Sequence, residues 1–238
     1  MTGRYDIERD AERAFAVLRD GGIAILPMDV GYSLIGGSAE ALSRIFATKR
    51  RAAGKLNAML GDREIHEALH AVDDRARDVV EAITLDADLP LGIIAPARMT
   101  HPLLAAIDPD ALNASTADGT LCMLVNAGAF HAAICRLSCQ ATHPLFGSSA
   151  NLSLSGTKFR VEDIEPELLA IADIVIDHGL RTYHLYQGSS TLLNLETFEV
   201  VRYGACFELI ADVLARHFDV RLPPPPDGHL LNLIGHRL

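Results

Sequence analysis

Four positively charged residues gather in one short stretch of a chain that is acidic overall. Lys49, Arg50, Arg51 and Lys55 lie within seven residues, between a predicted helix and a predicted strand. A loop at this place can carry cationic side chains toward a phosphate or a carboxylate. A charged run of this kind is more often a solvated surface. Two further features of the sequence favour a local anion-binding site.

These two features are loops that leave predicted strands. The stretch GSSANLSLSGTK (147–158) combines glycines with small hydroxyl residues, and such loops bind anionic oxygens through hydroxyls and backbone N–H groups. Ordinary turns share that composition, so the signal is weak alone. The stretch PMDVGYSL (27–34) leaves the first strand and carries Asp29 and Tyr32. The alternative there is a plain strand-turn-strand connection with a structural tyrosine.

Short apolar strands alternate with amphipathic helices and must position these loops. We predict helices at 6–19, 38–48, 76–83, 130–139, 164–172 and 207–218, with Ser38 as an N-cap. We predict strands at 22–27, 57–60, 91–96, 120–125, 145–148, 173–177, 190–195 and 198–202. This order predicts one α/β domain with a mixed sheet.

Composition excludes several classes of protein. With 238 residues, 49% of them hydrophobic, the chain can bury one substantial core. The 21 Lys and Arg against 31 Asp and Glu give a net charge of -10, which excludes a broad polyphosphate-binding surface. No apolar run approaches the roughly 20 residues of a membrane span, and the first residues do not resemble a signal peptide. We therefore expect a cytoplasmic protein without a membrane partner.

Cysteines and histidines give no convincing metal site. Cys135 and Cys139 are four residues apart but lack two further ligands at a comparable spacing, so we expect buried small hydrophobes in a reducing compartment. His66 and His70 have the same spacing on a predicted helix and could bind zinc, but a solvated helical face is the preferred interpretation.

The chain is expected to consist of a domain at 1–218 and a proline-spaced C-terminal tail at 219–238. Four consecutive prolines, 223–226, predict an extended spacer. The tail beyond them carries Leu230, Leu231, Leu233 and Ile234. These side chains can dock on their own domain or on a second copy, which would give a homodimer, and the sequence leaves both open.

Several segments, in order, resemble the YrdC-like family, whose best-known members are threonylcarbamoyl-adenylate synthases of tRNA modification. GGIAILPMDVGYSL is similar to the family's Pro-Thr-Asp-Thr-x-Tyr-Gly-Leu, and IFATKRR to its Ile-x-x-x-Lys-x-Arg. SSANLSLSG is similar to its Thr-Ser-Ala-Asn-x-Ser-Gly, and SSTLLNL with VVRYG to its Ser-Thr-x-x-Asp and Leu-Arg-x-Gly. The resemblance runs from about Gly21 to Gly204.

The resemblance implies an open, twisted, mixed α/β sheet with helices on both faces around a concave basic cavity. The family binds ATP with Mg²⁺, threonine and bicarbonate there, and it releases pyrophosphate to leave threonylcarbamoyl-AMP. Three anions must be held together in that reaction, so the protein contributes mainly positioning and positive charge.

The nucleotide side of the family's site looks mostly retained. The resemblance implies that Lys49 and Arg51 reach phosphate and are the catalytic pair. It assigns nucleotide contacts to Lys55, Thr120, Ser149, Asn151 and Arg202, and it implies that Ser190 closes over the ligand. One residue is inserted before Ser155 and Gly156, which puts the loop there in doubt.

The amino-acid side of the site looks altered around Tyr32. Met28 and Val30 replace the family's two threonines. Leu124 stands at the arginine expected to hold the carboxylate of threonine, and Leu60 at a histidine. Losing the arginine partner of a buried carboxylate costs roughly 3 to 5 kcal/mol. We therefore expect a less polar acceptor amine.

Three alternatives remain open from the sequence. The first is an ordinary threonylcarbamoyl-adenylate synthase with compensating contacts elsewhere. The second is a carbamoyltransferase that uses a different carbamoyl donor, carbamoyl phosphate. The third is a non-catalytic protein that binds nucleotide or double-stranded RNA, which the net charge of -10 disfavours. The partners expected in all enzymatic versions are ATP, bicarbonate or another carbamoyl donor, an amine acceptor and proteins of tRNA modification.

Overall fold

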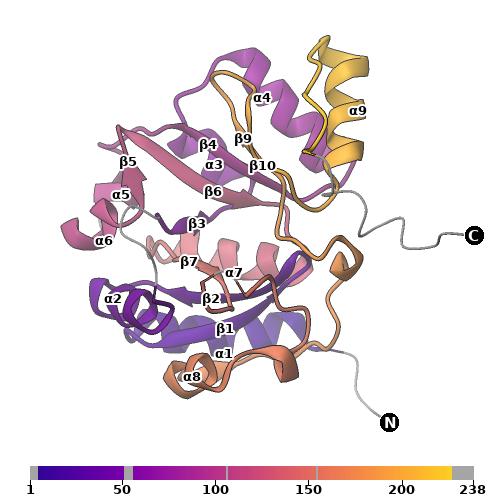
Figure 1. The fold of residues 1–238 in the computed structure, drawn as a ribbon. Helices are drawn as coiled ribbons and strands as arrows, with labels where there is room; N and C mark the ends of the chain where they lie inside the picture. The colour runs from indigo at the N-terminus through magenta and orange to yellow at the C-terminus, as the bar shows by residue number, and fades with distance from the viewer. Residues whose placement is uncertain (1–4, 51–55, 106, 154, 227–238) are drawn as a thin grey trace, which may run out of the picture.

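The computed structural model describes residues 5–50, 56–105, 107–153 and 155–226. Ten strands in these ranges form one mixed sheet in the order β10-β9-β4-β6-β3-β7-β2-β1-β8, with β5 paired to β6 (Figure 1). The strands are β1 (Ile23–Met28), β2 (Gly31–Gly36), β3 (Ala58–Leu60), β4 (Leu91–Pro96), β5 (Thr116–Ala117), β6 (Thr120–Val125), β7 (Phe146–Ser149), β8 (Ile174–Val175), β9 (Leu192–Asn194) and β10 (Val200–Arg202).

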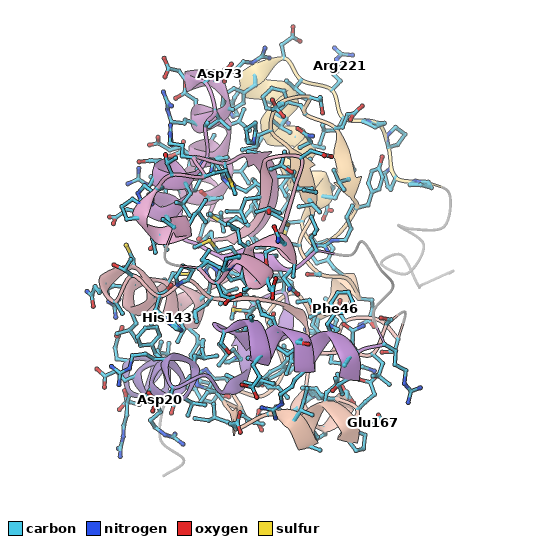
Figure 2. The ribbon with its side chains drawn as sticks, turned by 90° about the vertical axis from the view of Figure 1, so that its left-hand side faces the viewer. Asp20, Phe46, Asp73, His143, Glu167 and Arg221 are labelled. Carbon is cyan, nitrogen blue, oxygen red and sulfur yellow. The ribbon has the colours of Figure 1, made fainter. Side chains whose placement is uncertain are left out.

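Helices lie on both faces of the sheet, as expected for an open α/β fold. They are α1 (Ile7–Arg19), α2 (Ala39–Thr48), α3 (Arg63–Leu69), α4 (Asp74–Glu81), α5 (Pro102–Ala105), α6 (Pro109–Asn113), α7 (Ala129–Gln140), α8 (Pro166–Ile171) and α9 (Phe207–Phe218). Figure 2 shows Asp20 after α1 and His143 after α7 on one side, with Phe46 of α2 and Glu167 of α8 on the other. No helix in the described part of the chain is long and apolar enough to span a membrane.

The predicted helix starts have a physical cause that the structure shows. The Ser38 side chain accepts a hydrogen bond from the backbone N–H of Ala41 at 3.2 Å, as an N-cap does. The Asp6 side chain caps α1 in the same way. Both helices bury their apolar stripe against the sheet, which fixes the end of α2 beside the strands β2 and β7.

The first two strands form a tight hairpin, which is the plain strand-turn-strand connection that the sequence analysis gave as the alternative at residues 27–34. β1 pairs antiparallel with β2 from Ile23 and Gly36 to Met28 and Gly31. Gly31 has a φ of +116°, and a Cβ there would lie 2.4 Å from Cγ2 of Thr157, so only glycine fits. β2 was not among the predicted strands because its apolar side chains do not alternate with polar ones. All six of its residues are buried.

The interpretation of His66 and His70 as a solvated helical face is wrong. Both side chains are 1% exposed, and their Nδ1 atoms lie 2.8 Å apart. His70 also contacts the carbonyl oxygen of Leu121 through Nε2 at 3.2 Å. The expectation for the cysteines is half wrong, since Cys135 is buried but Cys139 is exposed.

Burial of this histidine pair predicts acid destabilisation. Removal from water is the first cause that lowers the pKa of His66 to about 4 and that of His70 to about 3, from 6.5. Glu67, Arg77 and Arg98 also act on the pair. Below pH 6.5 the unfolded chain takes up protons that the native chain does not, so stability falls as the pH drops toward the lowered values. Between pH 7 and pH 5 each histidine should cost roughly 1 to 2 kcal/mol of the free energy of unfolding.

Urea unfolding at pH 7 and pH 5 measures this effect. The double variant His66→Leu, His70→Leu should lose less stability between the two pH values than the unmodified chain loses. Replacing the exposed His217 by Gln should leave the pH dependence of the unmodified chain in place. An identical acid loss in the double variant would contradict the assignment.

Candidate functional site

A cavity of about 350 Å³ opens on one face of the sheet, where alternate strand residues form its floor. In a strand, every second side chain points to the same face. Register places Ser33 beside Ser149, Ala58 beside Gly147, and Leu60 beside Leu124. The cavity is lined by Ser33, Ile35, Lys49, Leu56, Ala58, Leu60, Gly92, Cys122, Met123, Leu124, Gly147, Ser148, Ser149, Asn151, Ser153, Ser189, Ser190, Leu192 and Arg202.

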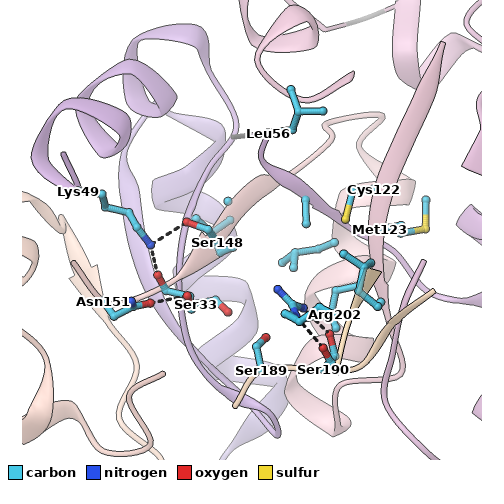
Figure 3. A pocket seen from close by; sticks show the side chains of 18 of the residues that line it. Ser33, Lys49, Leu56, Cys122, Met123, Ser148, Asn151, Ser189, Ser190 and Arg202 are labelled. Atoms are coloured by element: carbon cyan, nitrogen blue, oxygen red, sulfur yellow. Dashed lines mark hydrogen bonds between the residues drawn. The ribbon is translucent and has the colours of Figure 1, made fainter. Parts of the chain in front are cut away.

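One wall of the cavity is built around Lys49 (Figure 3). Lys49 follows the last residue of α2 and is only 4% exposed. Its Nζ donates to the Ser148 hydroxyl at 2.9 Å and to the carbonyl oxygen of Ser149. The end of α2 thereby places a buried cation beside the last residues of β7. In the hydrogen bonds described, this ammonium donates to neutral oxygens of β7 at the wall of the cavity.

The other wall carries Arg202 on β10, three strands beyond the centre of the cavity. Its Nε donates to the Ser190 carbonyl oxygen at 3.0 Å and a terminal nitrogen to the Ser190 hydroxyl at 3.2 Å. Among the described residues, no carboxylate forms an ion pair with Arg202. Arg202 is exposed as a residue, but the protein atoms around its guanidinium replace part of the water there, and this desolvation lowers the pKa of the guanidinium from its ordinary value. Figure 3 shows Lys49 and Arg202 on different sides of the cavity.

The loop after β7 is held in place by Glu165. Ser155 donates to this carboxylate at 2.6 Å, and Lys158 forms an ion pair with it at 3.0 Å. Burial opposes ionisation of Glu165, but these partners outweigh it and lower the pKa of the carboxyl to about 2. The clamp fixes the segment that brings Asn151 and Ser153 to the cavity, where Ser153 also donates to the Lys49 carbonyl oxygen at 2.9 Å.

The structure brings most of the predicted site residues together. Seven of them line the cavity: Lys49, Leu60, Leu124, Ser149, Asn151, Ser190 and Arg202. Arg51 and Lys55 lie outside the described residues. Which of the seven contacts a ligand stays a prediction.

Four predicted site residues are absent from the cavity lining. Met28 and Tyr32 are fully buried and Val30 is 2% exposed, so the three belong to the core. The Tyr32 hydroxyl bonds Asp177 at 3.0 Å and the Gly179 carbonyl oxygen at 2.9 Å, which is a structural role. Thr120 is the first residue of β6, two residues before Cys122 of the lining, and its hydroxyl donates to the Ala117 carbonyl oxygen at 2.7 Å.

The residues that the sequence analysis missed are the small and apolar ones. Ile35, Ala58, Cys122 and Leu192 line the floor, and Ser33 and Ser148 stand beside Lys49. The signal that could have found them is the strand period, since Cys122 is two residues from Leu124 and Ala58 two residues from Leu60. The missing information was which strands are neighbours.

The described lining offers no protein site for a metal ion. Neither Asp nor Glu is present in the lining, and no group of three or more His, Cys, Asp or Glu in the described ranges could hold a metal. Mg²⁺ prefers carboxylate, phosphate and water oxygens. The described lining therefore provides no ligand set of its own for Mg²⁺.

The chain matches one protein family in sequence and several solved structures in fold. Residues 16–204 match the family described as "Telomere recombination", which groups Sua5, YciO and YrdC sequences. No curated protein matches the chain in sequence. Among solved structures, the hypothetical protein smu.1377c from Streptococcus mutans UA159 is 18% identical with a TM-score of 0.73, and the similarity covers 89% of this chain and 93% of that one.

Two further structures are similar over most of this chain. P. abyssi Sua5 complexed with L-threonine is 20% identical with a TM-score of 0.70, over 93% of this chain and 61% of that longer one. E. coli YciO is 22% identical with a TM-score of 0.62, over 83% and 90%. At these identities the similarity shows a shared fold: an open, twisted, mixed sheet with helices.

Proposed function

The chain belongs to the Sua5/YciO/YrdC family, and from this premise we propose that it is an enzyme that forms a carbamoyl-adenylate from ATP, bicarbonate and an amine. One observation carries the proposal. Lys49 and Arg202 face one cavity whose lining contains no carboxylate among the described residues. Such a cavity binds a small polyanion, and a nucleoside triphosphate is the polyanion that this family's chemistry consumes.

The proposed reaction has two steps, formation of a carbamate and its adenylation. The amine nitrogen attacks the carbon of bicarbonate, and a proton from nitrogen leaves with hydroxide as water, which gives a carbamate. A carbamate oxygen then attacks the α-phosphorus of ATP. The bond between that phosphorus and the bridging oxygen breaks, and pyrophosphate leaves with its electron pair. The product is a carbamoyl-adenylate, and no oxidant or reductant is needed.

The residues of the cavity position and neutralise these groups. Lys49, fixed by Ser148 and Ser149, places a cation where the phosphates meet β7. Arg202, oriented by Ser190, places a second cation on the far wall. Arg51 and Lys55 are proposed as further phosphate contacts from the family resemblance. Mg²⁺ supplies additional charge neutralisation when it is bound with the nucleotide.

The acceptor is proposed to differ from threonine. Sua5 of P. abyssi has been solved with L-threonine, whereas the described part of this cavity carries leucines at the positions where the resemblance expects polar side chains. A place beside proteins of tRNA modification follows from the family and is part of the proposal. A homodimer through the tail remains a prediction.

Calorimetric titration with ATP and Mg²⁺ tests the nucleotide site. Arg202→Met should weaken ATP binding by about 10-fold to 100-fold, because a charge-assisted contact contributes about 1.5 to 3 kcal/mol. Arg136→Met is a matched control, since Arg136 pairs with Glu8 on the surface. Absence of ATP binding by the unmodified chain would overturn the proposal. Binding of duplex RNA that weakens steeply with salt, without ATP binding, would favour the RNA alternative instead.

A further inference from the structure

Leu60 and Leu124 form an apolar patch in the cavity lining, in which Leu124 is partly exposed and Leu60 is 2% exposed. They are partners in the parallel pair of β3 and β6, so both side chains point to the same face of the sheet. Cys122 follows on that face two residues along β6. The two leucines are therefore one joint feature of the cavity, and their effects on a ligand combine.

The strand on the other side of Leu124 leaves the patch open. Gly92 of β4 is the antiparallel partner of Leu124 and has no side chain to cover it. A Cβ at Gly92 would lie 3.0 Å from Ser190 Oγ and 3.0 Å from Leu192 Cδ1. These two side chains therefore pack directly against Gly92. Leu192 therefore forms an apolar boundary of the cavity beside Gly92.

The two cations of the described lining are held at its two walls, away from β3 and β6. The Lys49 ammonium is bonded at β7. Two nitrogens of Arg202 are bonded to Ser190, before β9. The strands β3 and β6 themselves present no cation to the cavity. A carboxylate placed beside Leu60 and Leu124 would lose water without gaining a cation from β3 or β6, which is unfavourable.

We propose that the acceptor is a primary amine with an apolar substituent and no carboxylate, with Leu60 and Leu124 as the specificity-determining residues. The inference rests on the proposed function, because it names the substrate class of the same site. The apolar substituent lies on the leucine patch, and the amine nitrogen faces the bicarbonate between the two cationic walls.

The matched pair of leucine and isoamylamine tests this inference, because the two amines differ only by the carboxylate. The full chain is incubated with ATP, Mg²⁺, bicarbonate and either amine, with threonine as a third arm, and pyrophosphate release is followed. We expect kcat/KM for isoamylamine to exceed that for leucine and threonine by about 100-fold, the factor that about 3 kcal/mol gives.

The variant Leu124→Arg should shift this preference toward the amino acids by at least about 10-fold. Leu60→His, a smaller change, should shift it in the same direction. ATP titration of each variant checks that it is folded. A wild-type preference for threonine or leucine would overturn the inference, and so would an unchanged preference in folded Leu124→Arg. Pyrophosphate release with none of the amines, while ATP still binds, would also overturn it and leave the nucleotide site standing. Absence of ATP binding would instead sink the proposed function.

Discussion

Replacing Lys49 by Met is expected to weaken ATP binding at least about 100-fold, which corresponds to about 2.7 kcal/mol. Met keeps most of the apolar stem but removes the buried ammonium and its contacts with Ser148 and Ser149. The cavity would then lose one of its two described cations, and the phosphates would lose a charge-assisted partner in a desolvated place. Isothermal titration with ATP and Mg²⁺ measures the effect.

The neighbouring Arg50 provides a matched control. Its side chain is 77% exposed, pairs with Glu167 at 3.6 Å and does not line the cavity. Arg50→Met removes the same charge from the same stretch of sequence, yet it should change the ATP affinity less than about 2-fold. Equal losses in both variants would show that overall positive charge matters and that the cavity does not select Lys49.

Replacing Gly147 by Ala is expected to destabilise the protein by about 3 kcal/mol or more. A Cβ at Gly147 would lie 2.1 Å from the carbonyl oxygen of Leu34 and 2.7 Å from Ile35 Cδ1. Gly147 pairs with Ile35 on β2 and with Ala58 on β3, so neither neighbouring strand can move without breaking the sheet. Urea unfolding measures the loss directly.

Gly188 is the control for this substitution. The nearest atom that its Cβ would meet is the Tyr186 carbonyl oxygen at 3.7 Å, an ordinary contact. Gly188→Ala should change the free energy of unfolding by less than about 0.5 kcal/mol. A small effect at Gly147 would mean that β7 is not packed between β2 and β3 as described.

The sequence predicted where the strands and helices lie along the chain better than it predicted which strands pair with each other. Leu91–Pro96 and Thr120–Val125 were predicted with the boundaries that the structure shows, because continuous or alternating apolar runs between turn residues mark strands. The pairing of β3 with β6, and of β2 with β7, depends on contacts far apart in sequence. No local pattern carries that information, which is why the floor of the cavity was found only in the structure.

In the candidate site, too, sequence motifs identified some residues correctly as cavity lining but did not show which others are buried in the core. Lys49, Ser149, Asn151, Ser190 and Arg202 were recognised because their motifs resemble a family. Met28, Val30 and Tyr32 come from an equally recognisable motif, but the hairpin directs them into the core. All six residues of β1 and all six of β2 are buried, and Val30 in the turn between them is 2% exposed, which a one-dimensional motif does not record.

The fate of carbon-labelled bicarbonate tests the central claim most directly. The full chain is incubated with ATP, Mg²⁺, labelled bicarbonate and isoamylamine. The nucleotide products are then separated, and their masses are determined by mass spectrometry. The proposed reaction predicts an adenylate that carries the labelled carbon, together with an equal amount of pyrophosphate, and loss of both in Lys49→Met. Release of ADP and phosphate with no label in any nucleotide would contradict it.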